Sequence, residues 1–158
     1  MTRVGITGHR DLHDPTYALV SAAITKQLGE LGLVHGISSL AEGADQIFAE
    51  QVLKAGGTLT AVIPSAQYGR SFATTAGKAA YRRLRALASE VIQLPFRSPS
   101  AEAYWAAGQR VVELADVLVA VWDGRPSRGV GGTADIVAFA GQRGVPTTVV
   151  WPPGSRRG

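Results

Sequence analysis

The stretch VHGISSLAEGADQIFAEQVLKAGGTLTAVI, residues 34–63, has the pattern of one strand–helix–strand unit. Its apolar runs, 34–40 and 59–63, are rich in β-branched residues and mostly lack polar alternation, which is typical of strands buried on both faces of a parallel sheet. Between them, small and apolar residues recur at helical spacing until a glycine pair ends the helix: Ala44, Phe48, Val52, Ala55, Gly56 and Gly57. A helix that joins two parallel strands predicts the α/β class.

The same alternation extends from this unit to both ends of the chain. Four more apolar runs, at 4–7, 91–94, 117–122 and 147–151, bring the number of predicted strands to six. Four more helical stripes separate them: one runs from Asp14-Pro15 to Gly32, one covers 80–88, one follows Ser98-Pro99, and one covers 132–143. This order predicts a three-layer α/β domain with a mainly parallel six-stranded sheet and right-handed crossovers.

Length and composition indicate one domain. The chain has 158 residues, of which we assign 1–152 to the domain and expect 153–158 to be a flexible C-terminal tail. The absence of cysteine excludes a disulfide framework and a thiolate zinc site. The longest strongly apolar run is far shorter than the roughly 20 residues that cross a bilayer, and no leader pattern opens the sequence. We therefore expect a cytoplasmic protein without membrane partners.

The net charge of +4 is modest, but the cations are unevenly distributed. Between Glu50 and Glu90 there are six cations and no acid: Lys54, Arg70, Lys78, Arg82, Arg83 and Arg85. A basic face attracts phosphates of any kind. Single-stranded nucleic acid is therefore one possible partner, while an ordinary solvated helix face has the same pattern.

Ligands of open α/β sheets bind beyond the carboxyl ends of the strands, where the strand order reverses. After the first predicted strand come Thr7, Gly8, His9 and Arg10. Gly8 allows a close backbone approach, and Arg10 can hold a phosphate through two parallel hydrogen bonds. After the second come Ser39, Glu42, Gly43 and Asp45. There the free N–H groups of a helix start at Gly43 attract an anion, and the carboxylates of Glu42 and Asp45 can accept hydrogen bonds from a sugar or base.

The fifth predicted strand is followed by Asp123-Gly124 and then by Gly131-Gly132-Thr133 at the start of a helix. Free backbone N–H groups of the glycines and the Thr133 hydroxyl can bind a phosphate there. The carboxylate of Asp123 can then recognise a sugar or base. Neither the G-x-G-x-x-G pattern nor a Walker lysine is present, which excludes ordinary NAD binding and a Walker loop. His9 and His13 precede the predicted helix and do not indicate a metal site, and nothing in the sequence indicates a bound cofactor.

Four motifs taken together resemble the SLOG superfamily, which includes the DNA-processing protein A family and the Lonely Guy phosphoribohydrolases. They are VGITGHR at 4–10, SSLAEGAD at 38–45, AGG at 55–57 and GGT at 131–133. The middle block looks most like DNA-processing protein A. The resemblance implies a Rossmann-like fold that binds nucleotides, nucleotide-derived signals or nucleic acid through the three loops.

Two positions depart from the patterns of these relatives. Lonely Guy enzymes carry P-G-G-x-G-T-x-x-E with a catalytic glutamate, whereas here Ile136 stands at that position and Asp135 is one residue short, a rotation of about 100° on a helix. In DNA-processing protein A the residue that matches Glu42 is usually basic.

We therefore predict a protein that binds or senses a nucleotide-like small molecule. An N-glycosidic hydrolase of nucleoside monophosphates is the alternative, with Glu42, Asp123 or Asp135 as its candidate catalytic acid. We also expect a homo-oligomer, because the helix over 101–115 carries apolar residues on more than one side: Tyr104, Trp105, Val111, Val112 and Leu114.

Overall fold

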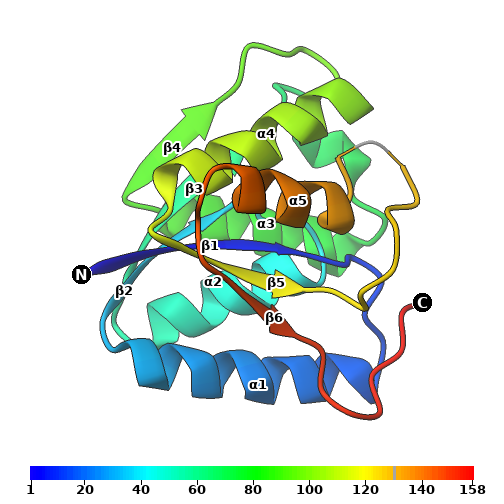
Figure 1. The fold of residues 1–158 in the computed structure, drawn as a ribbon. Helices are drawn as coiled ribbons and strands as arrows, with labels where there is room; N and C mark the ends of the chain where they lie inside the picture. The colour runs from blue at the N-terminus through cyan, green and yellow to red at the C-terminus, as the bar shows by residue number, and fades with distance from the viewer. Residues whose placement is uncertain (130) are drawn as a thin grey trace.

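A computed structural model describes residues 1–129 and 131–158. All six predicted strands form one parallel sheet with the order β4-β3-β2-β1-β5-β6 (Figure 1). The strands are β1 (Thr2–Gly8), β2 (Val34–Ser38), β3 (Thr58–Ile63), β4 (Glu90–Gln93), β5 (Val117–Val121) and β6 (Thr147–Val150). The helices are α1 (Thr16–Leu31), α2 (Ala44–Lys54), α3 (Thr75–Leu87), α4 (Ala101–Leu114) and α5 (Thr133–Gln142), with a 3-10 turn η1 (Tyr68–Ser71). The predicted α/β class is confirmed.

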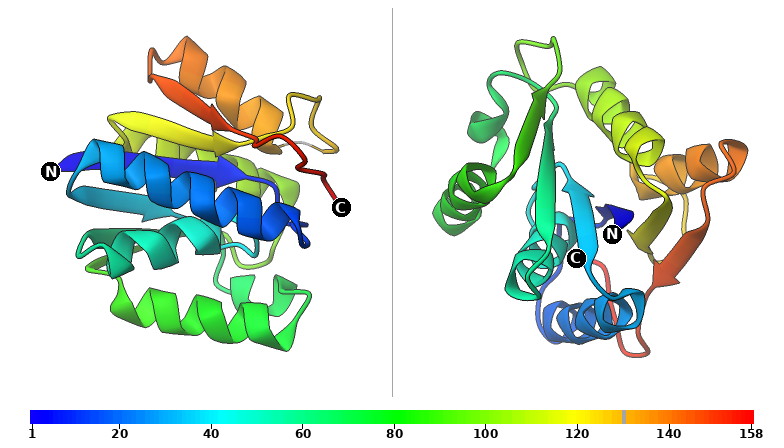
Figure 2. Two further views of the ribbon diagram at one scale, coloured as in Figure 1. Left: turned by 90° about the horizontal axis from the view of Figure 1, so that it is seen from below. Right: turned by 90° about the vertical axis from the view of Figure 1, so that its left-hand side faces the viewer.

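The strand order places the reversal of the sheet between β1 and β5. From β1 the chain proceeds outward through β2, β3 and β4, then crosses back to β5 on the other side of β1. The helices α1, α2 and α3 cover one face of the sheet, and α4 and α5 cover the other (Figure 2). Since all strands are parallel, the loops that follow β1, β2 and β5 leave the sheet at the same edge.

Apolar side chains fill both spaces between the sheet and its helices. Under α1 and α2 the core includes Val20, Ile24, Phe48 and Val52, all at most 1% exposed. These residues belong to the apolar stripes that predict the two helices. The side chains that recur at helical spacing are therefore the ones buried against the sheet.

Three helix starts differ from their predicted positions. The largest difference is at α3, which begins at Thr75 instead of at residue 80, because the Thr74 hydroxyl accepts a hydrogen bond from the Gly77 N–H and caps the helix there. Pro15 stands at the N-cap of α1 rather than in its first turn, and α1 begins at Thr16 without a side-chain cap. The helix α4 begins two residues after Pro99, because the hydroxyl of Ser100 accepts a hydrogen bond from the Ala103 N–H and caps it. Serine and proline at neighbouring positions are both start signals, and only the cap geometry distinguishes them.

The last residues, for which the sequence predicts a flexible tail, lie against the start of α1 and the loop after β1. The Arg156 N–H donates to Thr16 Oγ1 at 2.7 Å, and the Gly158 N–H donates to the Asp11 carbonyl at 3.0 Å. This places the tail beside the carboxyl ends of β1 and β5 (Figure 1). No helix among the described residues is long and apolar enough to span a membrane; a cytoplasmic location stays a prediction.

Candidate functional site

A cavity of about 420 Å³ opens at the reversal point of the sheet, between the loops that follow β1, β2 and β5. Its volume lies in the range of small-molecule sites. Nine of the thirteen residues predicted to bind a ligand line it: Thr7, Gly8, His9, Arg10, Ser39, Asp45, Gly131, Gly132 and Thr133. The three loops are far apart in the sequence and meet at this cavity.

Two glycines allow the first two loops to approach each other. A Cβ at Gly8 would lie 2.5 Å from the Ala44 Cβ, and a Cβ at Gly43 would lie 2.5 Å from the His9 carbonyl oxygen. Gly43 also has a φ of +80°, a conformation that favours glycine. The contact uses the start of α2: the Ala44 N–H donates to the His9 carbonyl at 3.1 Å. This amide is therefore occupied by the protein and is not available to an anion.

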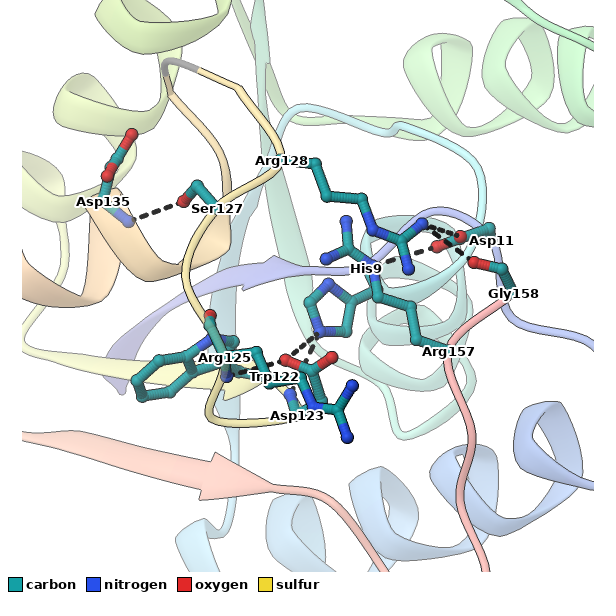
Figure 3. A network of polar contacts seen from close by, with 10 residues as sticks. All are labelled: His9, Asp11, Trp122, Asp123, Arg125, Ser127, Arg128, Asp135, Arg157 and Gly158. Carbon is teal, nitrogen blue, oxygen red and sulfur yellow. Dashed lines mark hydrogen bonds and ion pairs between the residues drawn. The ribbon is translucent and has the colours of Figure 1, made fainter.

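His9 joins the ends of β1 and β5. Its N–H donates to the Val121 carbonyl, and its Nε2 accepts a hydrogen bond of 3.0 Å from the Asp123 N–H (Figure 3). Burial, and then the nearby Arg157 charge, lower the pKa of His9 and outweigh the attraction of Asp123. The Asp123 Oδ1 lies 3.3 Å from the same Nε2, which leaves Nδ1 as the other nitrogen of the ring. That buried Nδ1 has no hydrogen-bond partner among the described residues.

The floor of the cavity holds a buried acid beside an arginine. Burial raises the pKa of Asp45 to about 7, against the opposing effects of Arg10 and of the hydrogen bond from the Ala41 N–H. The Arg10 guanidinium lies 4.6 Å from the centre of the Tyr104 ring, a cation–π contact that orients it. Tyr68, 1% exposed, also lines the cavity, and its hydroxyl has no partner in the described part of the chain.

The glycine loop before α5 is held by Asp135. Its Oδ2 accepts a hydrogen bond of 3.0 Å from the Gly131 N–H, and its own N–H donates to Ser127 Oγ (Figure 3). Gly132 is the N-cap of α5, and Thr133 is the first residue of the helix. The Asp135 side chain lines a different, shallower hollow between α4 and α5, so its carboxylate serves the loop and does not face the cavity.

The remaining predicted residues lie outside the cavity lining. The Glu42 carboxylate turns toward the start of α3, where it accepts hydrogen bonds from the Ala73 N–H at 2.7 Å and Thr74 Oγ1 at 2.8 Å. Gly43 packs beneath the His9 carbonyl. Asp123 lines a neighbouring cavity, and Gly124 forms the exposed turn after it with a φ of +82°. Burial acts to raise the pKa of Asp123, but the hydrogen bond from the Arg125 N–H and nearby positive charge lower it by more, so the net direction is downward.

Five polar or charged residues outside the predicted binding set also line the cavity: Asp11, Tyr68, Tyr104, Arg128 and Arg157. Asp11 pairs with both arginines, Arg128 at 3.3 Å and Arg157 at 3.5 Å. Arg128 adjoins the glycine loop and could have been noticed there. No sequence motif marks Arg157 as a site residue. It belongs to the C-terminal tail, and the tertiary structure brings it to the cavity (Figure 3).

Two other sequence patterns lie apart from the cavity. The cations of 70–85 are carried by η1 and α3, and none of them lines the cavity; Arg83 pairs with Glu50. The second apolar side of α4 packs against α5, where the Trp105 and Phe139 rings are 5.7 Å apart. Packing within the chain therefore accounts for the pattern behind the expected self-association, which stays a prediction.

Several solved structures share this fold. DNA processing protein A from Streptococcus pneumoniae matches with a TM-score of 0.73 and 18% identity, over 98% of this chain and 52% of that one. The Helicobacter pylori protein of the same name, which binds single-stranded DNA, matches with a TM-score of 0.70 and 17% identity, over 99% and 68%. The molybdenum cofactor binding protein from Rippkaea orientalis matches with a TM-score of 0.60 and 16% identity, over 94% and 75%.

These likenesses confirm the Rossmann-like fold that the four motifs imply. The chain spans about half the length of the Streptococcus pneumoniae protein. No protein-family model matches the sequence, and no curated protein is detectably similar to it.

Proposed function

We propose that this protein binds a nucleotide or a nucleotide-derived ligand in the cavity at the carboxyl ends of β1 and β5. One observation carries the proposal: residues of three glycine-bearing loops, from positions 7–10, 39–45 and 131–133, line a single cavity of about 420 Å³. Reversal points of parallel sheets are where such folds bind their ligands.

The lining suits a molecule with an anionic part and an apolar, planar part. Ile6, Ala107, Val111 and Ile136 supply an apolar wall. The lining also provides positive charge and hydrogen-bond donors for a phosphate, from Arg10, Arg128 and the start of α5 at Thr133. The His9 Nδ1 and the Tyr68 hydroxyl have no partner among the described residues and are further groups that a sugar or base could satisfy.

The similar structures favour the same class of ligand without specifying it. One binds single-stranded DNA and another binds the molybdenum cofactor. Both ligands combine phosphate with a heterocycle, which is the chemistry of this lining.

Titration calorimetry with AMP, GMP, CMP and UMP tests the proposal. We expect saturable binding of at least one of them, weaker binding of the matching nucleoside, and a loss of about tenfold or more in Arg10→Gln, which removes a charge-assisted hydrogen bond. Arg110→Gln is the matched control, because Arg110 is an exposed arginine of α4 that does not line the cavity. Gly132→Asp, which puts a carboxylate at the N-cap of α5, should abolish binding.

Two results would contradict the proposal. One is the absence of binding for every nucleotide by a folded wild-type protein. The other is unchanged affinity in both Arg10→Gln and Gly132→Asp, which would place the nucleotide elsewhere on the molecule.

A specific observation also favours cleavage of an N-glycosidic bond as a second candidate function. Asp45 lines the cavity with a pKa of about 7, the range in which a carboxyl group can give and take a proton at neutral pH. In this reaction water attacks C1′ of the sugar while the C1′–N bond breaks. The departing base takes up a proton from Asp45, and Asp45 recovers a proton from the attacking water. Of the acids selected from the sequence, Glu42, Asp123 and Asp135 are outside the cavity lining.

Chromatography of AMP, GMP, CMP and UMP after incubation with the protein tests this second function. Release of free base that is lost in Asp45→Asn and retained in Asp135→Asn and Asp123→Asn supports it. No base after long incubation of a protein that binds nucleotides would leave binding as the function.

A further inference from the structure

A second cavity adjoins the first and is rich in arginine. It has a volume of about 530 Å³, and its lining includes Asp123, Arg125, Arg128, Ser155, Arg156 and Arg157. Arg128 and Arg157 line both cavities and so form their common wall. A ligand that passes these two side chains would extend from the first cavity into the second.

The charges of the second cavity are not balanced by the protein. Four arginines line it against one acid, Asp123. Asp11, in the first cavity, pairs with Arg128 and Arg157, so both of these cations share a single carboxylate. The nearby His9 contributes no charge, because burial lowers its pKa. An excess of guanidinium groups around one hollow attracts a polyanion and is unfavourable without one.

Two buried polar atoms in this lining have no hydrogen-bond partner among the described residues: Ser155 Oγ and Arg157 Nε. The 3.5 Å separation of Arg157 Nε from Asp11 Oδ1 is a charge contact and does not satisfy the donor. Leaving buried polar atoms unpaired costs about 1–3 kcal/mol each, so such atoms at a cavity wall indicate a missing partner. Phosphate oxygens would accept from both groups.

The tail that carries these residues is anchored on both sides. The Arg156 N–H donates to Thr16 Oγ1, and the Gly158 N–H donates to the Asp11 carbonyl. On the other side, the Gly158 carbonyl accepts a hydrogen bond of 2.9 Å from Arg128 Nη1 (Figure 3). The tail therefore presents Ser155, Arg156 and Arg157 from a backbone that is held by hydrogen bonds.

We infer that the second cavity is a subsite for the distal phosphates of a nucleoside diphosphate or triphosphate. The inference rests on the proposed function, in which the start of α5 and Arg10 hold the first phosphate. From there the phosphate chain would pass Arg128 and Arg157 and end against Arg125 and Arg156. The ligand class is thereby narrowed to nucleotides with a phosphate chain, and a nucleoside monophosphate would fill only the first cavity.

The test compares AMP, ADP and ATP by calorimetry in the wild type and in an Arg125→Gln, Arg156→Gln double variant. In the wild type we expect Kd to fall by at least tenfold from AMP to ATP, since a single added charge-assisted contact contributes about that much. In the double variant the ratio of the two Kd values should approach one. Arg97→Gln is the control, because Arg97 is an exposed arginine that lines neither cavity.

Inorganic tripolyphosphate separates this inference from the proposed function. If no nucleotide binds but tripolyphosphate raises the melting temperature of the wild type and not of the double variant, the subsite stands and the nucleotide proposal fails. Equal wild-type affinities for AMP and ATP would overturn the subsite while the nucleotide proposal survives. Preferential binding of a single-stranded oligonucleotide that the double variant loses would overturn the assignment to nucleoside polyphosphates.

Discussion

The imidazole Nε2 of His9 accepts a hydrogen bond of 3.0 Å from the backbone N–H of Asp123. One side chain thereby holds together the ends of β1 and β5, the two strands between which the sheet reverses. The edge of the same ring meets Trp151, with ring centres 5.4 Å apart, so the segment that follows β6 is joined to this contact as well. The mouth of the cavity depends on a residue that is itself 3% exposed.

Replacing His9 by phenylalanine should lower the free energy of unfolding by about 1–3 kcal/mol. Phenylalanine keeps an aromatic ring but leaves the Asp123 N–H without an acceptor, and an unpaired donor carries that cost. Urea denaturation measures the change. His13→Phe, at an exposed histidine, should alter stability by less than about 0.5 kcal/mol. Equal stabilities for the two variants would mean that the His9 hydrogen bond contributes nothing.

Alanine at Gly43 should be far more damaging than alanine at Gly29. The added Cβ at Gly43 would lie 2.5 Å from a backbone carbonyl and would have to adopt a φ of +80°, which together cost about 2–5 kcal/mol. A Cβ at Gly29, within α1, meets nothing within 4 Å. There we expect a gain of up to about 1 kcal/mol, because alanine favours the helix. Thermal unfolding of both variants checks the sign of each change.

The free energy of unfolding of the wild type should include a contribution from Asp45 that decreases as the pH rises from about 4 to 7. Over this window folded Asp45, with its pKa raised from 3.8 to about 7, still holds a proton that the unfolded chain has released, so raising the pH favours unfolding. An asparagine at this position has no such proton to lose. As the pH rises, the free energy of unfolding of Asp45→Asn should therefore increase relative to that of the wild type. The relative increase should reach up to about 4 kcal/mol at pH 8. Denaturation curves at several pH values measure the difference.

Asp14→Asn provides the comparison for this pH series, because Asp14 is exposed. Its stability should follow that of the wild type at every pH. Parallel curves for Asp45→Asn and the wild type would show instead that Asp45 is ionised throughout the window.

Glu42→Ala should destabilise the protein by about 1–2 kcal/mol and leave nucleotide affinity within about twofold. The lost carboxylate accepts from the Ala73 N–H and Thr74 Oγ1 at the start of α3, and it does not line the cavity. Denaturation and calorimetry on one preparation measure both quantities, with Glu30→Ala, at an exposed acid of α1, as the stability control. A large loss of affinity at unchanged stability would give Glu42 a direct role in binding.

The sheet and its helices could be predicted from local pattern because burial imposes that pattern. Residues 34–63 alternate between a strand buried on both faces and a helix buried on one, and those two environments select different periods of apolar residues. The glycines at 8, 43 and 131–132 were also visible, because few other residues fit a close approach or a bare loop. That these loops share one edge follows from parallel strands alone.

The direction of each polar side chain, and the origin of the arginines, did not follow from the sequence. Asp45 and Glu42 are three residues apart, yet one lines the cavity and the other contacts the start of α3, since a helix start sends neighbouring side chains in different directions. Arg157 and His9 come from opposite ends of the chain and lie beside each other in space. The local sequence pattern indicates which residues are buried. Contacts between distant segments depend instead on the tertiary structure of the whole chain. The second cavity is formed by such contacts.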